Sequence, residues 1–416
     1  MKVTVNKEPN CRRLLEIEVP QEEVAAHFNR LVAEYRAEAS IPGFRRGKAP
    51  SDLVKKRYYD SIKKDLKEKL MTDYFSLALK QEKINPYDAH THEQGDIDET
   101  KPYTFKVVVE TYPEFEPDGY KGLKANKKVR ETTDKDIMDT LQYIQRSNAE
   151  YHPVERACHD QDLVVVDLIK KYDKMNRLDD NKLENVEVDL GGDGVLKEFK
   201  DGLKGMKIGE MKDIEVKYPE EYSDKLLAGN EVKYTAIVKE VKEIKLPELN
   251  DEFAKNYGPA DTLDQLKNDI KQNLDDQASR EATNNVKSDL IKQIVEKNRF
   301  EIPESMIENY LKSVTEDFKK RYKDVDELKL RQNYRPVGED TIRWQFLFRK
   351  IAGKENLQVS EQDRAEWVKQ FAAQYNMSEQ SAREALGKAG KFEDIDDNLL
   401  ERKVLDFIME NAKISS

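Results

Sequence analysis

The sequence predicts a multidomain α+β protein: an N-terminal α+β domain with a helical hairpin, a small antiparallel β domain and an all-helical C-terminal domain. Three observations lead to this fold class. The chain has 416 residues, which favours two or three domains over one. Strand-like segments, separated by short Gly-bearing turns, lie between residues 151 and 243. Helical spacing dominates from residue 246 almost to the end.

The first 112 residues combine strands with two amphipathic helices. Apolar residues alternate through residues 1–20, as is typical of strands, until Pro20 ends the pattern. The next helix is predicted from an apolar stripe at Val24, Phe28, Leu31, Val32 and Tyr35. Ser51 is predicted to cap a second helix. The apolar residues of that helix recur every four positions, at Val54, Tyr58, Ile62, Leu66, Leu70 and Tyr74. YTFKVVVE (103–110) returns as a strand.

A connector precedes the small β domain. YPEFEPDGYKGL (112–123) holds two prolines and two glycines and should be extended or turned. A capped helix is predicted over residues 132–145. The β domain is predicted from four strand-like segments and one short helix, at residues 163–169, 185–190, 211–218, 233–241 and 195–199.

Successive helices are predicted after residue 246. Pro303 and Pro336 are expected to lie between helices, because proline disrupts a helix interior. WQFLFRKIA (344–352) is the most apolar helical segment, and we expect it to form the spine of this domain.

The composition limits the protein class. Hydrophobic residues make up 38% and charged residues 37% of the chain, which is polar for a globular protein but too patterned for disorder. The net charge of −11 argues against nonspecific coating of nucleic acid. Cys11 and Cys158 are too few for a disulfide framework, which favours a reducing compartment. We find no signal-peptide core and no run of about 18 apolar residues, so we expect a soluble, cytoplasmic protein without a membrane partner.

One loop concentrates positive charge at the end of the predicted hairpin. IPGFRRGKAP (41–50) places Phe44 between a glycine and two arginines. Residues 41–70 hold ten Lys/Arg and four Asp/Glu, which gives a local net charge of +6 in an acidic chain. Such a patch can attract RNA phosphates or an acidic protein surface, with Phe44 as an apolar anchor. The alternative is a solvated hairpin with an ordinary loop, which lysine-rich helix faces usually indicate.

Other chemical signals are weak. His90 and His92 lack a third ligand nearby. GGDGVLKEF (191–199) lacks the third glycine and the Lys-Ser pair of a phosphate-binding loop. The carboxylates are too numerous to nominate an acid/base pair. We therefore expect no cofactor and no bound metal.

Several separated motifs resemble one family. GFRRGKAP (43–50) resembles the ribosome-docking signature of bacterial trigger factor, GFRxGKxP. YPEFEPDGYKGL resembles the family's linker start, and FKDGLKGMKIGE (199–210) followed by YPEEY (218–222) resembles its FKBP-like domain. LPELNDEFAKNYG (246–258) resembles the entry to its C-terminal chaperone domain. The motifs cover nearly the whole chain in the family's order, which is more specific than one octamer.

The resemblance implies a cytosolic chaperone that binds the ribosome near the exit tunnel, through ribosomal protein and rRNA. It would hold unfolded nascent polypeptides in an open conformation during folding, and the family also implies homodimers off the ribosome. The implied domains are a ribosome-binding tail (1–112), a linker (113–150), an FKBP-like peptidyl-prolyl isomerase domain (151–243) and a helical chaperone body with arms (244–416). A stand-alone prolyl isomerase and an off-ribosome general holdase are the alternatives.

The resemblance also implies two sets of site residues. The ribosome-binding set is Gly43, Phe44, Arg45, Arg46, Gly47 and Lys48. The isomerase pocket would be lined by Phe199, Tyr222, Leu196 and Leu168. A dry aromatic pocket favours the twisted, less polar transition state of X–Pro isomerisation, so this chemistry needs no nucleophile.

The pocket departs from the family's pattern. Asp167-Leu168 stands where the family has aspartate-phenylalanine, and residues 171–186 replace a family segment that contains phenylalanine. The pocket aromatics are therefore reduced. An active isomerase and an FKBP-like scaffold kept for substrate binding or spacing both stay open.

Apolar residues of the helical domain could face either the core or a client. The candidates are Met306, Ile307, Trp344, Phe346, Leu347, Phe348, Ile351, Phe371, Tyr375, Phe407 and Met409. Aromatic residues at helical spacing are more often core, so we favour the core for each of the first seven. The last four stay unassigned between core and cradle.

Overall fold

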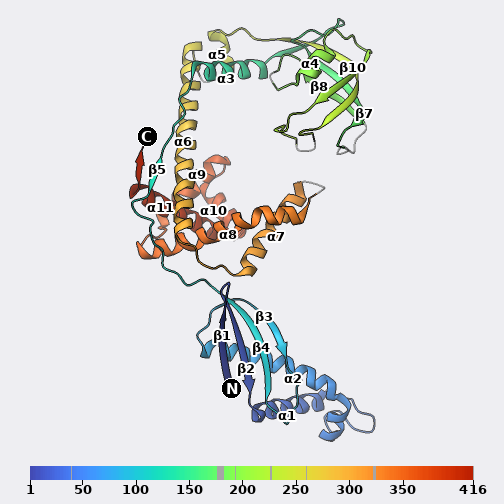
Figure 1. Ribbon diagram of the computed structural model, residues 1–416, viewed down its shortest axis with the longest axis vertical. Helices are drawn as coiled ribbons and strands as arrows, with labels where there is room; N and C mark the ends of the chain where they lie inside the picture. The colour runs from blue at the N-terminus through green and yellow to red at the C-terminus, as the bar shows by residue number, and fades with distance from the viewer. Residues whose placement is uncertain are drawn as a thin grey trace. The chain divides into compact units, whose positions relative to one another are not determined.

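The structure is a computed structural model that describes residues 1–38, 40–175, 182–192, 194–224, 227–258, 260–321 and 325–415 (Figure 1). It divides into two compact units. The first unit combines Met1–Lys128 with Thr283–Ser416, and the second comprises Val129–Ala282. The N-terminal strands and the C-terminal helices therefore belong to one unit, although they are far apart in the sequence.

The N-terminal part of the first unit is an antiparallel sheet with two helices on one face. In the order β1-β2-β4-β3, the sheet contains β1 (Lys2–Glu8), β2 (Arg12–Val19), β3 (Pro86–Gln94) and β4 (Tyr103–Thr111). Alternate residues of β2 and β4 form one core with α1 (Gln21–Glu38) and α2 (Ser51–Gln81). The buried helix positions match the predicted stripes at Val24, Phe28, Leu31, Val32, Val54, Ile62, Leu66, Leu70 and Tyr74.

Two details of α2 differ from the prediction. Ser51 does not cap the helix, because the helix begins at Ser51 itself and Pro50 occupies the N-cap position without a side-chain bond. The rigid φ of Pro50 and its carbonyl, which accepts the amides of Leu53 and Val54, start the helix instead. At Tyr58 the backbone leaves helical geometry (φ −115°, ψ 17°), so this member of the stripe is only partly buried.

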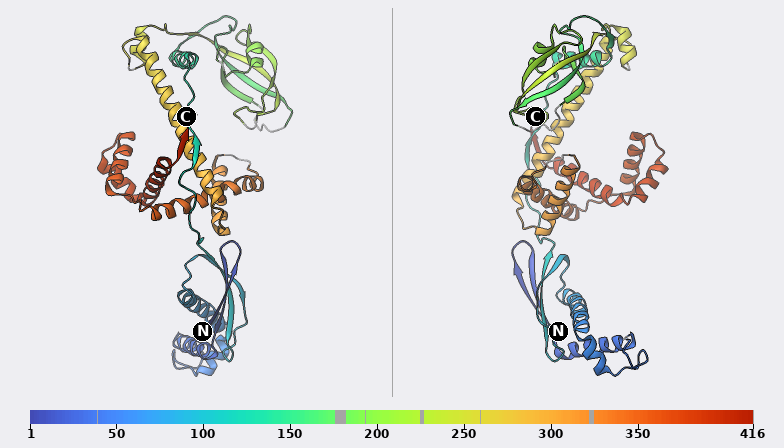
Figure 2. Two further views of the ribbon diagram at one scale, coloured as in Figure 1. Left: turned by 60° about the vertical axis from the view of Figure 1, so that its left-hand side comes forward. Right: turned by 90° about the vertical axis from the view of Figure 1, so that its right-hand side faces the viewer.

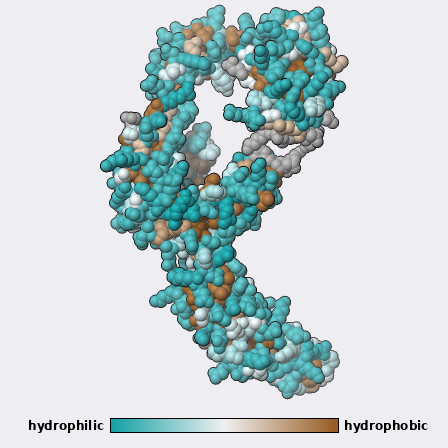
Figure 3. Space-filling model, viewed as in Figure 1, coloured by the Kyte–Doolittle hydropathy of each residue, from teal (hydrophilic) through white to brown (hydrophobic). Residues whose placement is uncertain are grey.

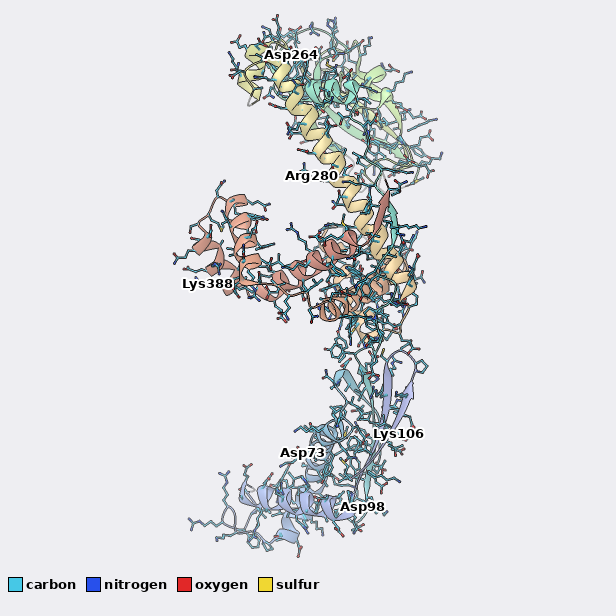
Figure 4. The ribbon with its side chains drawn as sticks, turned by 90° about the vertical axis from the view of Figure 1, so that its left-hand side faces the viewer. Asp73, Asp98, Lys106, Asp264, Arg280 and Lys388 are labelled. Atoms are coloured by element: carbon cyan, nitrogen blue, oxygen red, sulfur yellow. The ribbon has the colours of Figure 1, made fainter. Side chains whose placement is uncertain are left out.

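The C-terminal part of the first unit is helical. It contains the end of α6 (Leu263–Lys297), followed by α7 (Glu304–Arg321), α8 (Glu327–Lys354), α9 (Glu361–Gln374), α10 (Glu379–Lys388) and α11 (Phe392–Glu410). Helices α6, α8 and α11 meet in one core, and α9, α10 and the start of α11 form a smaller one (Figure 2). Lys388, labelled in Figure 4, marks the end of α10.

The two prolines behave differently. Helix α7 begins directly after Pro303, which confirms that boundary. The prediction for Pro336 is wrong, because this residue lies inside α8. Packing holds the helix on both sides of it: Arg335 pairs with Glu304, and Gly338 lies against the ring of Tyr310. Pro336 is exposed, so water can bind the carbonyl that has lost its helical donor.

The segment that follows β4 is bonded to the helical body. Buried Asn298 accepts the Asp118 amide at 2.9 Å and donates to the Asp118 carbonyl at 2.8 Å. Further along, β5 (Lys124–Asn126) pairs in parallel with β11 (Lys413–Ser415), as Figure 1 also shows. Residues 113–128 thus form part of the first unit rather than a free tether.

The second unit is built around a five-stranded antiparallel sheet. Its elements are α3 (Asp134–Ser147), β6 (Glu150–Pro153), β7 (Leu163–Asp173), β8 (Lys182–Asp189), α4 (Lys197–Leu203), β9 (Met211–Lys217), β10 (Glu231–Lys245), α5 (Asp251–Tyr257) and the start of α6. The order is β6-β10-β7-β8, with β9 also paired to β10. The four predicted strands and the short helix are confirmed, whereas β6 was not predicted.

A second, smaller core packs α3 and α5 against the start of α6, where Figure 4 labels Asp264 and Arg280. The capping box of Thr133 and Asp136 starts α3, which confirms the predicted capped helix.

The predicted fold class is confirmed: an N-terminal α+β region, an FKBP-like β domain and a helical C-terminal region. The four residue ranges assigned to domains stay a prediction. Among the described residues, no helix is both long enough and apolar enough to cross a membrane.

Candidate functional site

The loop between α1 and α2 consists of two successive turns. The Phe44 amide donates to the Ile41 carbonyl at 3.1 Å, and the Lys48 amide donates to the Arg45 carbonyl at 2.9 Å. Gly43 and Gly47 have φ of +89° and +78°, which residues with a Cβ rarely adopt. The backbone therefore needs glycine at both positions, and the two turns carry Phe44, Arg45 and Arg46 between them.

These turns present Phe44 to solvent. Its side chain is 42% exposed, and Arg45, Arg46 and Lys48 are exposed as well. Of the ten cations between residues 41 and 70, all within the described chain, only Lys69 has a carboxylate within 4 Å, at Glu34. The positive charge of the tip is thus not neutralised by ion pairs within the domain.

A small apolar cluster supports the loop from below. Ile41, Ala49 and Val54 are buried together, with Tyr35 and Tyr58 packed against them. The Tyr35 hydroxyl donates to Asp65 Oδ2 at 2.6 Å, and this bond, with burial, raises the pKa of Tyr35 to about 12. The loop is therefore anchored at both ends, which lowers the entropy lost on docking.

The structure brings the four predicted pocket residues to one core of the β domain. Leu168 is buried, and Leu196, Phe199 and Tyr222 are partly buried against the same cluster. Leu196 is the N-cap residue of α4, and its carbonyl accepts the Phe199 amide at 3.0 Å. Tyr222 ends a turn in which its amide donates to the Pro219 carbonyl at 3.1 Å.

Sequence reasoning missed two tyrosines beneath these rings. Tyr234 lies 6.1 Å from Phe199, and Tyr218 lies 4.9 Å from Tyr222, measured between ring centroids. The hydroxyls of Tyr218 and Tyr234 are 3.4 Å apart. Their positions follow from strand alternation, since Tyr234 shares the inward face of β10 with Ala236. That pattern was visible in KYTAIVKEV (233–241) and could have identified Tyr234.

Burial governs the ionisation of this tyrosine pair. Burial, together with the Tyr234 hydroxyl, raises the pKa of Tyr218 far above its usual range. Burial also raises the pKa of Tyr234. Both rings therefore stay neutral at ordinary pH, and the pair adds no charge to the cluster.

Asp167 lies on the opposite face of β7 from Leu168. Its carboxylate accepts the Asn185 amide at 3.0 Å and lies 3.3 Å from Lys182 and 3.2 Å from Lys239. These partners hold the pKa of Asp167 below its usual value, the Asn185 bond foremost. Asp167 is thus a structural anion rather than a member of the aromatic cluster. Residues 176–181 of the replaced family segment lie outside the described residues.

Within the described ranges, no group of three or more His, Cys, Asp or Glu side chains is placed to hold a metal ion. His90 and His92 are exposed on β3. The expectation that the protein uses no cofactor stays a prediction.

The candidate client residues divide by burial. Trp344, Leu347, Phe348 and Ile351 lie in the body core, and Met306 and Ile307 lie in a core between α7 and α8. Phe346, Phe371, Phe407 and Met409 are partly buried beside these cores. Tyr375 is 58% exposed and continues a stack of rings from Trp367 and Phe371.

Comparisons with known proteins agree along the chain. A family model described as bacterial trigger factor protein matches residues 1–144, and the model of its C-terminus matches residues 262–410. The model described as FKBP-type peptidyl-prolyl cis-trans isomerase matches residues 154–241, which include the aromatic cluster.

Whole proteins give the same result. The chain is 29% identical to the trigger factor of Geotalea uraniireducens, covering 100% of this chain and 98% of that protein. It is 28% identical to the trigger factor of Alkaliphilus metalliredigens, with both chains fully covered. A solved structure of the trigger factor chaperone shares the fold, with a TM-score of 0.53, 23% identity and 99% coverage of both chains. The chain therefore belongs to the bacterial trigger factor family of chaperones.

Proposed function

We propose that this chain is a ribosome-associated chaperone whose α1–α2 tip docks near the exit tunnel while its helical body holds nascent polypeptides. One observation carries the proposal: Phe44 is 42% exposed between two turns, within a segment of net charge +6. An exposed aromatic ring contributes nothing to the core of its own domain. Its burial becomes favourable when a binding partner covers it. The unpaired cations can attract rRNA phosphates and acidic ribosomal protein.

Gly43 to Lys48 are the proposed ribosome contacts. Arg45 and Arg46 offer forked donors that match phosphate or carboxylate, and Phe44 supplies the apolar anchor. Gly43 and Gly47 keep the turns in a conformation that other residues resist. Each residue therefore has a separate physical role that a single substitution can remove.

Client holding is supported by scattered apolar side chains on the helical body. Leu328, Val337, Tyr375 and Met377 are exposed on or beside α8 and α9. The face shown in Figure 3 is mostly hydrophilic with small apolar patches. Weak binding of many unfolded segments calls for such dispersed patches rather than one deep pocket. We infer unfolded nascent polypeptides as clients, together with a cytoplasmic location and the four domain ranges predicted from the sequence.

The test is co-sedimentation of the full chain with vacant bacterial ribosomes. The variant Phe44→Ala/Arg45→Ala/Arg46→Ala should lose binding, because both the anchor and two cations are gone. The matched control is Tyr143→Ala/Lys197→Ala/Lys207→Ala, which removes one exposed ring and two exposed cations from the second unit. This control should bind as the unmodified protein does.

Two results would contradict the proposal. Equal sedimentation of the tip variant and the control would remove the docking role from residues 43–48. Absence of ribosome binding by the unmodified chain would favour the off-ribosome holdase. In that case every variant should suppress client aggregation as well as the unmodified chain does.

A second candidate activity is prolyl isomerisation by the β domain. It is favoured by the FKBP-type match over residues 154–241 and by the cluster of Phe199, Tyr218, Tyr222 and Tyr234. Tyr222, at the edge of the cluster, has a hydroxyl that can bind a substrate carbonyl. A stand-alone isomerase would act strongly on short proline peptides and bind no ribosome, which separates it from the chaperone.

We also propose that the chain forms homodimers when it is not bound to the ribosome. Sedimentation equilibrium of the purified protein tests this.

A further inference from the structure

The N-terminal sheet and the helical body meet at a joint made of two chain segments. One is the β1–β2 turn with the end of β4, and the other is the stretch from Phe300 to Ser305 that leads into α7. We use "the joint" for these contacts. All of them lie in the first unit.

The central contact is a buried carboxylate. Glu110 is 2% exposed near the end of β4. Its Oε1 accepts from Arg12 Nε at 3.1 Å, and its Oε2 accepts from the Ser305 amide at 2.9 Å and from the Ser305 hydroxyl. Burial alone would raise the pKa of Glu110, but the bonds from Ser305 and Arg12 hold it below its usual value. The carboxylate is therefore charged at neutral pH.

This carboxylate takes the place of a helix cap. The residue before α7 is Pro303, whose side chain has no hydrogen-bond acceptor. The first amides of a helix need acceptors, and a negative charge is favourable at that end. Glu110 supplies both to α7 from a position 195 residues earlier in the chain. The bidentate pair of Glu304 with Arg335 then ties the same turn to α8, with both contacts at 2.7 Å.

A second set of contacts lies beside the first. The Asn10 amide donates to Glu301 Oε2 at 2.8 Å, and Cys11 Sγ donates to the Glu301 carbonyl at 3.2 Å. Asn10 and Cys11 both have left-handed φ, near +60°, which is uncommon outside glycine. Thr111 completes the set by donating its amide to the Cys11 carbonyl at 2.9 Å. The turn is thus held in a strained conformation that points its donors at Glu301.

Open hollows lie beside the contacts made by Glu301. Two pockets of about 270 Å³ flank the joint, and both are lined by Phe300 and Glu301. The nearby apolar contacts include the ring pairs of Phe115 with Phe300 and of Tyr112 with Phe346. Tyr87 of β3 also packs against the core between α7 and α8, and its hydroxyl accepts from Asn309 Nδ2 at 3.3 Å. The contacts at Glu301 therefore lie beside open hollows, whereas the Glu110 carboxylate is buried.

We propose that Glu110 is a latch that couples the N-terminal sheet to the helix pair α7–α8, so that the first turn of α7 and the β1–β2 turn open and close together. When the sheet contacts the helical body, Glu110 caps α7. When the sheet moves away, the Ser305 amide at the start of α7 loses its acceptor. The inference does not depend on ribosome binding or on isomerase activity.

The test is hydrogen–deuterium exchange of the full chain, read at two places. In Glu110→Ala the amides of residues 305–308 should exchange about tenfold faster, which is the usual size of a lost cap. The Asn10 amide should accelerate to a similar extent, although it has no contact with Glu110. The control is Asp88→Asn, since Asp88 pairs with Glu110 across β3 and β4 but is exposed, and its carboxylate accepts the amide of its own neighbour, Ala89.

Glu301→Gln gives the reciprocal experiment. It weakens the acceptor of Asn10 and leaves Ser305 untouched, so coupling predicts faster exchange at residues 305–308. Acceleration confined to residues 305–308 in Glu110→Ala would make Glu110 a local cap and overturn the latch. If Glu110→Ala fails to fold, Glu301→Gln decides alone: unchanged exchange at residues 305–308 overturns the proposal.

Discussion

The tip of the α1–α2 hairpin and the aromatic cluster of the β domain use aromatic residues in opposite ways. Phe44 is exposed on two turns, which a small apolar cluster anchors from below. Tyr234 is 3% exposed and packs against residues of several strands. A docking surface depends on a short contiguous segment, whereas an internal cluster depends on strand register. The comparison explains why the first is easier to recognise in a sequence and easier to alter without harm to the fold.

The largest expected difference between the two regions is the effect of a substitution on the free energy of unfolding. Tyr234→Ala removes a buried ring from the centre of the β-domain core and should cost about 3–5 kcal/mol of unfolding free energy. Phe44→Ala should change this free energy by less than about 0.5 kcal/mol, because the ring lies at the surface outside any buried core. Exchange of the amides of β7 and β10 measures the first effect locally. A Tyr234→Ala protein with wild-type protection there would show that the ring is not part of the core.

The next largest difference between the two regions should be in prolyl isomerase activity. Phe199→Ala widens the proposed pocket without emptying the deeper core, so kcat/KM on a proline peptide should fall about thirtyfold, or ~2 kcal/mol. Ribosome binding should stay unchanged. Phe44→Ala should show the reverse pattern and serves as the control. An unmodified chain that is inactive on the peptide would favour the scaffold role of the β domain.

Much of the fold could be predicted because local patterns determine it. The stripes of α1 and α2 and the strands β7 to β10 follow from periodicity within single segments. The tip was identified by one contiguous motif. Tyr234 could have been identified from the alternation in residues 233–241. Its approach to Tyr218 depends on how β9 and β10 lie side by side, which no single segment reveals.

Errors of the prediction have the same origin. Pro336 was expected to end a helix, and local propensity supports that, but contacts with α7 on both sides of it carry α8 through. The bond from Ser305 to Glu110 spans 195 residues and has no signature in either segment. Tertiary contacts decide such positions, and sequence spacing alone does not encode them.

The salt dependence of ribosome binding can show which groups the arginines of the tip contact. If Arg45 and Arg46 contact rRNA phosphates, each lost contact should reduce the slope of log affinity against log salt by about 0.7–0.9. Arg45→Gln/Arg46→Gln should therefore flatten the slope by about 1.5. Phe44→Ala should lower affinity at every salt concentration with the slope unchanged. Equal slopes in all three proteins would mean that the arginines contact protein carboxylates or solvent instead.

The smallest effect concerns the hydroxyl pair of Tyr218 and Tyr234. Their pKa values are raised by burial, so the folded chain keeps phenol protons that the unfolded chain loses above pH about 10. This contribution to stability is complete below pH about 10 and declines as the pH rises beyond it. Tyr218→Phe should remove part of that decline, while at pH 7 its unfolding free energy should stay within about 1 kcal/mol of the unmodified protein.

Urea unfolding at pH 7 and pH 11, followed by tyrosine circular dichroism, measures this difference. Both tryptophans, Trp344 and Trp367, lie in the helical body, so tryptophan fluorescence can follow the unfolding of that part separately. Tyr172→Phe is the control, since that ring is exposed on β7 and its loss should leave the alkaline decline unchanged. If Tyr218→Phe and Tyr172→Phe lose stability equally between the two pH values, then the buried pair does not set the alkaline limit. Phe44→Ala leaves Tyr218 and Tyr234 in place, so this variant should follow the unmodified protein at both pH values.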